Sequence, residues 1–291
     1  MAIIIDEKTT VIVQGGTGKQ GALHTELMKK YGTKIVGVIK PGFSGSMNGI
    51  PIYSSVEEAQ SHGKVDATII FVPPAAVKDA FAEAIFSGVK VAVVITENVP
   101  IHDAIIMRRI SKEYGSILIG PNTIGIISPG KSKIGVMPSE LYKPGVVGIV
   151  SRSGTLTHEV ASIISESGLG ISTAIDIGGD MVVGTDFVEL VKMFNEDTET
   201  KAIVVIGEIG GSKEQELATY IASNKIKKPI ITYIAGIKAP PGKRMGHAGA
   251  IISGGATTAE AKLKILSSSG AIVARYIDEI PSLIDKGISQ F

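Results

Sequence analysis

The sequence lacks cysteine, and its positive and negative charges almost cancel. With no cysteine among 291 residues, disulfides, cysteine-ligated zinc and a cysteine nucleophile are all excluded. A formal net charge of +1 argues against a protein that is held on nucleic acid by bulk charge. No apolar run reaches about 18 residues, so no segment is expected to span a membrane. The first residues do not follow the signal-peptide pattern, because no basic residue precedes their short isoleucine run, and a cytoplasmic protein is expected.

Glycine is the residue type in excess. The chain has 35 glycines in 291 residues, about 12% against a usual ~7%, without a collagen-like period. Such a content indicates many tight turns and close approaches of backbone to ligands. Hydrophobic residues make up 44% and charged residues 20%, as in an ordinary globular protein, and the length favours two domains.

In the first part of the chain, β-branched runs alternate with helical patterns. The expected strands lie at residues 11–13, 34–39, 68–72, 91–95 and 117–119, and the expected helices at 19–31, 56–62, 75–87 and 101–114. The strands are nearly all apolar, as strands buried on both faces should be. This alternation predicts a parallel sheet with right-handed crossovers, and therefore a Rossmann-type domain over residues 1–122.

A second α/β series follows an interruption. Residues 123–145 are rich in proline and glycine and are predicted to be a connecting segment. We then expect strands at 146–150, 171–175, 202–206, 230–234 and 272–273, with helices at 156–167, 187–194, 214–223, 259–267 and 280–286. Residues 146–291 are therefore predicted to form a second parallel α/β domain.

A glycine motif lies between the first strand and the first helix. Gly16 to Gly21 fit the pattern G-x-G-x-x-G, which favours a phosphate at the helix N-terminus, although a plain glycine-rich turn is the alternative. An NAD site would require an acidic residue at the end of the second strand, where this sequence has Lys40. A cation there suits a phosphate-bearing ligand such as NADP or coenzyme A (CoA), and the motif does not choose between the two.

A second phosphate-loop pattern is rejected. Residues 125–132 match the P-loop pattern, but the following residues, up to Pro138, cannot form the helix that a P-loop requires. A better candidate is the stretch around Ser153, which follows a strand and opens a helix. Its hydroxyls and glycine can cap that helix and leave N–H groups for an anion, or only cap it. Ser153 as a hydrolase nucleophile would need a G-x-S-x-G turn, which is absent from this stretch.

His247 is the histidine most suited to chemistry among the five in the chain. Glycines flank it and two cations precede it, so it is placed to meet phosphate, although an ordinary exposed loop histidine is the alternative. Glu208 follows a buried strand and could orient an imidazole by accepting its N–H, or be a solvated loop glutamate. No second histidine or carboxylate lies at ligand spacing from His247, so no metal site is expected.

Three stretches, residues 148–157, 206–212 and 242–251, together resemble the α subunits of succinate–CoA ligases (succinyl-CoA synthetases). The resemblance covers essentially the whole chain. It implies an N-terminal Rossmann-type CoA-binding domain and a flavodoxin-like domain that carries a phosphohistidine. It also implies a reversible ligase that joins succinate to CoA at the expense of ATP or GTP. The nucleotide and Mg²⁺ would bind to the ATP-grasp site of a β subunit, in an αβ or α2β2 assembly without nucleic acid or membrane.

The resemblance also implies roles for individual residues. His247 would be transiently phosphorylated and Glu208 would orient it. The helix start at Ser153, Gly154 and Thr155 would hold the phosphate. The CoA site would be lined by Thr17, Gly18, Lys19, Gln20, residue 43, Thr96, Glu97 and Asn98.

Three departures from the family pattern qualify these expectations. The chain has Phe43 where lysine is common, and Lys19 or Lys40 is the candidate to supply the charge. His158 replaces a tyrosine of the helix that would face the β subunit. The segment with Asn122, near the expected carboxylate site, continues as Thr123-Ile124 instead of Cys-Pro. A malate–CoA ligase or another NDP-forming acyl-CoA synthetase therefore stays open, and so do an NADP-dependent oxidoreductase and a CoA-binding regulatory module.

Overall fold

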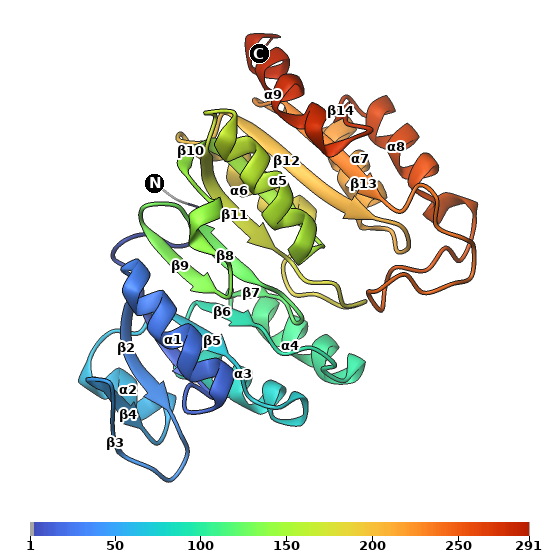
Figure 1. Ribbon diagram of the computed structural model, residues 1–291. Helices are drawn as coiled ribbons and strands as arrows, with labels where there is room; N and C mark the ends of the chain where they lie inside the picture. The colour runs from blue at the N-terminus through green and yellow to red at the C-terminus, as the bar shows by residue number, and fades with distance from the viewer. Residues whose placement is uncertain (1–2, 291) are drawn as a thin grey trace. The chain divides into compact units, whose positions relative to one another are not determined.

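The computed structural model describes residues 3–290, which form two compact units (Figure 1). The N-terminal unit comprises Ile4–Ser139 and Val182–Thr185. The C-terminal unit comprises Glu140–Met181 and the residues from Asp186 onward. The two units are described separately below.

The N-terminal unit contains a twisted sheet whose strands are almost all parallel. Its order is β3-β4-β2-β1-β5-β6-β7, and only β3 and β4 pair antiparallel. The strands are β1 Thr10–Gln14, β2 Lys34–Ile39, β3 Gly45–Met47, β4 Ile50–Tyr53, β5 Ala67–Ile70, β6 Val91–Val94 and β7 Ile117–Ile119. From β4 to β7 this is the Rossmann order 3-2-1-4-5-6, so the predicted fold is confirmed.

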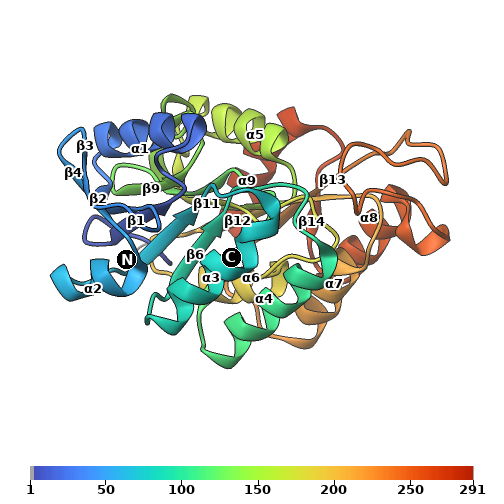
Figure 2. The ribbon, with the colours of Figure 1, turned by 90° about the horizontal axis from the view of Figure 1, so that it is seen from below.

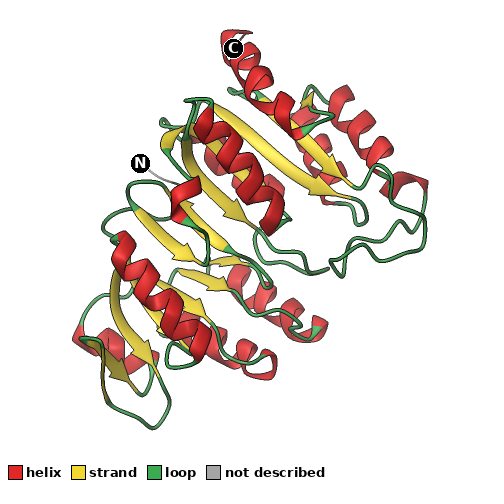
Figure 3. Cartoon of the chain, viewed as in Figure 1, coloured by secondary structure: helices red, strands yellow, loops and turns green. Residues whose placement is uncertain are grey.

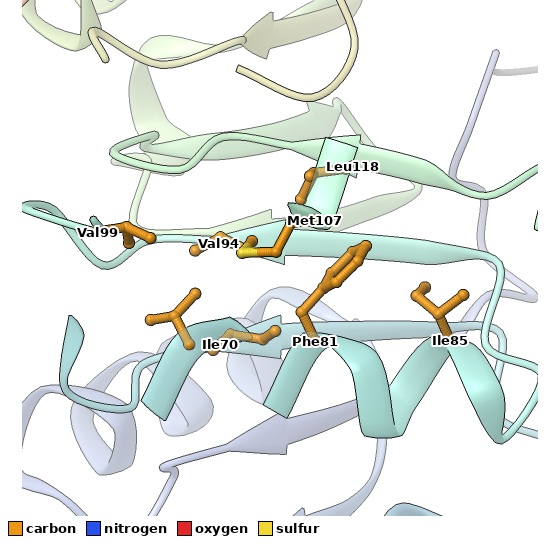
Figure 4. Packing of buried hydrophobic residues seen from close by; sticks show 9 residues of the cluster. Ile70, Phe81, Ile85, Val94, Val99, Met107 and Leu118 are labelled. Atoms are coloured by element: carbon orange, nitrogen blue, oxygen red, sulfur yellow. The ribbon is translucent and has the colours of Figure 1, made fainter. Parts of the chain in front are cut away.

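Helices cover both faces of this sheet. In Figure 2, α1 lies on one side of the sheet and α2, α3 and α4 lie on the other. The helices are α1 Lys19–Tyr31, α2 Val56–His62, α3 Val77–Phe86 and α4 Ile101–Glu113. Figure 4 shows the core under α3, where the fully buried Phe81 points toward Leu118 of β7 and Met107 of α4. This packing fixes the strands whose carboxyl ends carry the glycine loop.

The segment 123–145, which the sequence predicted to be an irregular connection, contains two strands in the structure. It contains an antiparallel hairpin, β8 Gly125–Ser128 and β9 Ser132–Gly135. The sequence hid these strands because glycines end both of them: a Cβ on Gly125 would lie 2.2 Å from the carbonyl oxygen of Ile134. The hairpin is tied to the N-terminal unit, since the Thr33 hydroxyl donates to the carbonyl of Lys133 at 2.7 Å. Ser132 begins a strand and not a helix, which confirms the rejection of the P-loop.

The C-terminal unit has a parallel sheet of another order. Its strands are β10 Pro144–Ser151, β11 Ile171–Asp176, β12 Ala202–Glu208, β13 Ile230–Ala235 and β14 Ile272–Val273. Across this unit the strands follow one another as β14-β13-β12-β10-β11, and every pair among them is parallel. Counted along the chain, this is the flavodoxin order 2-1-3-4-5, as the resemblance implied.

Helices again cover both faces, with α5 in front of the sheet and α6 behind it in Figure 1. The helices are α5 Gly154–Glu166, α6 Phe187–Glu196, α7 Lys213–Ser223, α8 Ala259–Ser268 and α9 Ile280–Gln290. Short 3₁₀ turns lie at Pro74–Ala76, Ser139–Leu141, Gly255–Thr257 and Ile277–Glu279. Between β13 and the 3₁₀ turn that precedes α8, residues 236–254 run as a long irregular loop (Figure 3). None of the helices within residues 3–290 combines the length and the apolar character needed to cross a bilayer.

Candidate active site

The strand order of the C-terminal unit reverses between β10 and β12. Parallel α/β sheets bind ligands beyond the carboxyl ends of their strands at such a reversal. Ser151 at the end of β10 pairs with Ile206 of β12, so the residues that follow the two strands face the same crevice. Arg152 and Ser153 follow the first strand, and Glu208 ends the second.

The long loop 236–254 brings His247 to this crevice. The Nδ1 atom of His247 lies 2.8 Å from Oε2 of Glu208. The Glu208 side chain is 8% exposed and the His247 side chain 31%, so the carboxylate is enclosed while the imidazole faces solvent in part. Because Nδ1 is engaged, Nε2 is the ring nitrogen left for a reacting group.

Several groups around His247 act on its proton affinity. The hydrogen bond to Glu208 is the largest influence and raises the pKa of His247 above its ordinary value, while partial burial opposes it. The charges of Glu208 and Asp176 also raise this pKa, and the charge of Arg152 lowers it. The imidazolium form is therefore stabilised by two carboxylates and restrained by one guanidinium.

Replacing Glu208 by glutamine is expected to lower the pKa of His247. The amide retains a hydrogen-bond acceptor but not the negative charge that stabilises the imidazolium. An NMR titration of the His247 ring in the full chain measures the change. Glu260→Gln, which removes an exposed carboxylate on α8, is the matched control and should leave the titration as it is. An unchanged or raised pKa in Glu208→Gln would contradict the assigned contact.

Glycines in the loops after β11 and β12, and in the His247 loop itself, allow close packing around His247. The sequence analysis did not identify the loop after β11. A Cβ on Gly179 would lie 2.5 Å from Cγ and Cδ2 of His247, so the backbone after β11 lies directly against the imidazole. Gly210, with a φ of +81°, has the same role toward the His247 loop, because its Cβ would lie 2.1 Å from the carbonyl of Gly249. The available signal was the pair Gly178-Gly179 directly after a parallel strand, like the pair that follows Glu208.

The helix start after β10 has the form that the sequence predicted. Ser153 is the N-cap of α5, and its hydroxyl accepts from the N–H of Leu156 at 3.4 Å. The N–H groups of Gly154 and Thr155 lie in the first turn, where a helix offers them no acceptor, so they can bind an anion.

His158 lies further along the same helix. Its Nδ1 is 2.7 Å from the hydroxyl of Tyr142, and burial lowers the pKa of His158. Burial therefore disfavours the charged form of this histidine, and the contact with Tyr142 gives it a packing role in the C-terminal unit.

The N-terminal unit has its own crevice, at the reversal between β1 and β5. Gly18 is the N-cap of α1 and makes no side-chain cap, so the N–H groups of Lys19 and Gln20 lie in an uncapped first turn. Gly21 lets the helix approach the loop, because a Cβ there would lie 2.3 Å from the carbonyl oxygen of Gly15. The loop therefore has the geometry of a phosphate cradle.

Two cavities open beside this loop and share Val72 in their walls. The first has a volume of about 380 Å³ and includes Thr17, Lys40, Asp79 and Glu83 in its lining. The second, of about 620 Å³, is lined in part by Gln20, Thr96, Glu97, Asn98, Asn122 and Thr123. The structure thus gathers residues from four predicted segments along one edge of the sheet.

Phe43, at the position where the family commonly has lysine, lies beside Lys40. It is 46% exposed and is not part of either lining. The ammonium of Lys40 lies 4.4 Å from the centre of the Phe43 ring, within cation–π range. Phe43 therefore steadies Lys40, which is the cation at the cavity. Among residues 3–290, no group of three histidine or acidic side chains is placed to hold a metal ion.

Comparisons with known proteins give a family match for part of each unit. A family model described as a CoA binding domain matches residues 6–98, and one described as CoA-ligase matches residues 150–272. Succinate–CoA ligase (ADP-forming) subunit alpha 2 of Archaeoglobus fulgidus is 53% identical over 285 residues, 98% of this chain and 99% of that protein. The chain belongs to the family of succinate–CoA ligase α subunits. The corresponding Aquifex aeolicus subunit is 46% identical over 293 residues, 100% of this chain and 94% of its own length.

A solved structure shows the same fold within a larger protein. ATP citrate lyase from Methanothrix soehngenii, in complex with citrate and coenzyme A, superposes with a TM-score of 0.90 at 26% identity. The superposition covers 99% of this chain and 50% of the lyase chain. The curated relatives are ligases, so the oxidoreductase alternative is not supported.

Proposed function

We propose that this chain is the α subunit of an ADP-forming succinate–CoA ligase that works through a phosphohistidine at His247. The observation that carries the proposal is the 2.8 Å contact between His247 Nδ1 and Glu208 Oε2 at the strand reversal. A carboxylate on one ring nitrogen fixes the tautomer and leaves the other nitrogen as a nucleophile.

In the first step, Nε2 of His247 attacks the γ-phosphorus of ATP. A P–N bond forms while the bond between the γ-phosphorus and the bridging oxygen of ADP breaks. The ring gains positive charge, and the enclosed Glu208 carboxylate stabilises it. The uncapped N–H groups of Gly154 and Thr155, with Ser153 as N-cap, are the groups proposed to hold the phosphoryl oxygens.

In the following steps the phosphoryl group moves to a carboxylate oxygen of succinate. The P–N bond breaks and a P–O bond forms, which returns the histidine and gives an acyl phosphate. The CoA sulfur then attacks the acyl carbon, so a C–S bond forms and inorganic phosphate leaves. The glycines around His247 give its loop the freedom to meet a donor and then an acceptor.

CoA is proposed to occupy the crevice of the N-terminal unit. Its phosphates would lie on the loop of Thr17 and Gly18 and the first turn at Lys19 and Gln20. Lys40 would supply the cation that the family commonly has at position 43, with Phe43 holding it. Thr96, Glu97, Asn98 and Asn122 would line the path of the pantetheine arm toward the carboxylate.

The partner of the proposed enzyme is a β subunit, in an αβ or α2β2 complex. Its ATP-grasp site would bind the nucleotide with Mg²⁺. The names of the relatives favour ATP over GTP. Malate or another carboxylate stays the alternative substrate, because Thr123-Ile124 departs from the family pattern near Asn122. Catalysis from soluble CoA and ATP fits a cytoplasmic location.

The proposal is tested by incubating the chain and its β subunit with γ-labelled ATP. Label on this chain that is lost in acid but stable in alkali is the expected result, because a phosphoramidate hydrolyses in acid. Addition of succinate and CoA together should then discharge the label as phosphate. Absence of label on this chain, or label that survives acid, would overturn the proposal. A panel of dicarboxylates in the same discharge assay separates succinate from malate.

A further inference from the structure

Three charged side chains are buried beneath Glu208. Arg152 is 2% exposed, and Glu214 and Lys262 are each 0% exposed. Charged groups are seldom buried unless they are paired, because the loss of hydration costs several kcal/mol for each ion. Together with Glu208 they form a set of two cations and two carboxylates, which we call the buried charge cluster.

Lys262 of α8 connects two parts of this cluster. Its ammonium forms an ion pair of 2.5 Å with Oε2 of Glu214 and donates to the carbonyl of Glu208 at 2.9 Å. It donates to the carbonyl of Gly210 as well. The first of these contacts neutralises a carboxylate, and the other two tie the loop after β12 to α8.

Glu214 makes a second hydrogen bond to the main chain of Glu208. Its Oε1 atom accepts from the backbone N–H of Glu208 at 3.2 Å. Both polar backbone groups of Glu208 therefore have partners from the buried charge cluster, and the backbone that carries the carboxylate is fixed from α7 and α8.

Arg152 lies between the two carboxylates. Its Nη2 atom is 3.2 Å from Oε1 of Glu208, and its Nη1 atom is 3.8 Å from Oε1 of Glu214. Within residues 3–290, Nε and Nη1 of Arg152 and Oε1 of Glu208 have no hydrogen-bond partner. Nε and Nη1 of the guanidinium therefore make no directed hydrogen bond, and its contacts with the two carboxylates are ionic.

We propose that Lys262, Glu214 and Arg152 are positioning residues for the phosphorylation of His247. Lys262 neutralises the charge of Glu214. The Arg152 guanidinium then pairs mainly with Glu208. This pairing offsets part of the negative charge that Glu208 presents to the imidazole. The cluster keeps His247 oriented by a carboxylate while preventing that carboxylate from locking the ring in its imidazolium form. The role in catalysis rests on the proposed phosphorylation of His247, whereas the effect of the buried charge cluster on the pKa of His247 does not depend on that proposal.

The charges that face His247 define what the test must separate. They are Glu208 from β12, Asp176 from β11 and Arg152 from the turn between β10 and α5; of these three charges, that of Arg152 lowers the pKa of His247 and the other two raise it. In Glu214→Gln, the amide still accepts hydrogen bonds, but Arg152 is drawn wholly to Glu208. In Lys262→Met, the charged Glu214 draws Arg152 away from Glu208.

The two variants are expected to change the pKa of His247 in opposite directions. NMR titration of the full chain should show a lower pKa of His247 in Glu214→Gln and a higher one in Lys262→Met. With the β subunit, the labelling rate at a pH on the acid limb should rise about threefold in Glu214→Gln and fall about threefold in Lys262→Met. The double variant Lys262→Met/Glu214→Gln should return close to the wild type, because it removes one charge of each sign.

Matched variants separate this role from a purely structural one. Glu260→Gln and Lys264→Met change exposed residues of α8 and should leave both readouts unchanged. In an Arg152→Gln background, Glu214→Gln should produce a smaller shift than in the wild type. If Lys262→Met does not fold, Glu214→Gln and the double variant still decide the question.

Shifts in the same direction in both single variants, or no shift in Glu214→Gln, would overturn the inference. The proposed function fails separately, by the absence of label on the wild-type chain. The titration can therefore support the buried charge cluster even if phosphorylation is disproved.

Discussion

Replacing His247 by asparagine is expected to abolish phosphorylation of the chain. Asparagine keeps a polar group near the position of Nδ1 but has no atom at the position of Nε2, and its amide nitrogen is not a nucleophile, so Glu208 loses the imidazole that it orients at 2.8 Å. Overall ligase activity with the β subunit should fall by at least about 10³-fold, because the two half-reactions are joined only through this side chain. The measurement is γ-labelled ATP incorporation together with succinyl-CoA formation.

The control for this prediction is His102→Asn. His102 is an exposed residue of the first turn of α4 and should be replaceable without loss of label. The folding of the His247 variant is checked by thermal unfolding, and its affinity for CoA, proposed to bind in the N-terminal unit, should stay that of the wild type. Label that persists in His247→Asn would place the phosphorylated group elsewhere.

A methyl group on Gly21 is expected to weaken CoA binding strongly. The added Cβ would lie 2.3 Å from the carbonyl oxygen of Gly15 and 2.9 Å from Cα of Gly16, both of them backbone atoms that cannot rotate away. Helix α1 or the loop must therefore shift, and the uncapped N–H groups at Lys19 and Gln20 move from their positions. Overpacking of this kind costs about 1–3 kcal/mol, and lost phosphate contacts should lower the CoA affinity about 10- to 100-fold.

The Gly21→Ala experiment needs a glycine control in the same unit. Gly63, at the end of α2, has open space around its Cα, and a Cβ there meets nothing within 4 Å. Calorimetric titration with CoA should give wild-type affinity for Gly63→Ala and a weakened one for Gly21→Ala. Wild-type affinity in Gly21→Ala would show that CoA does not use the glycine loop.

The regular elements of both units were predictable because their patterns are strong. The ranges Lys19–Tyr31, Lys34–Ile39 and Val56–His62 agree with the predicted ones residue for residue. Buried parallel strands are continuous apolar runs, and few other structures produce them. The small strands β3 and β4 and the hairpin of β8 and β9 were missed, because they are short and bounded by glycine, which reads as a turn.

The sequence indicated the residues proposed to react, but it did not indicate the buried side chains around them. The local pattern made His247 and Glu208 candidates, each with a solvated alternative, and the family resemblance supplied their roles; the structure places the two side chains 2.8 Å apart. Arg152, Glu214 and Lys262 were missed, since a charged residue in a loop or a helix is normally solvated and burial is decided by tertiary packing. Their sequence separation, with one on each of three elements, leaves no local pattern to detect.

Each unit carries its ligand-facing groups at a reversal of strand order, beyond β1 and β5 in one unit and beyond β10 and β12 in the other. Mutations that reshape the edge beyond β1 and β5 therefore act on a different set of strands from those that support His247. Changes at the proposed CoA crevice can therefore accumulate without altering the strands that support His247. Changes around His247 can likewise accumulate without altering the strands of the CoA crevice. Such separable inheritance would let one architecture serve enzymes as distant in sequence as the lyase that shares 26% of its residues.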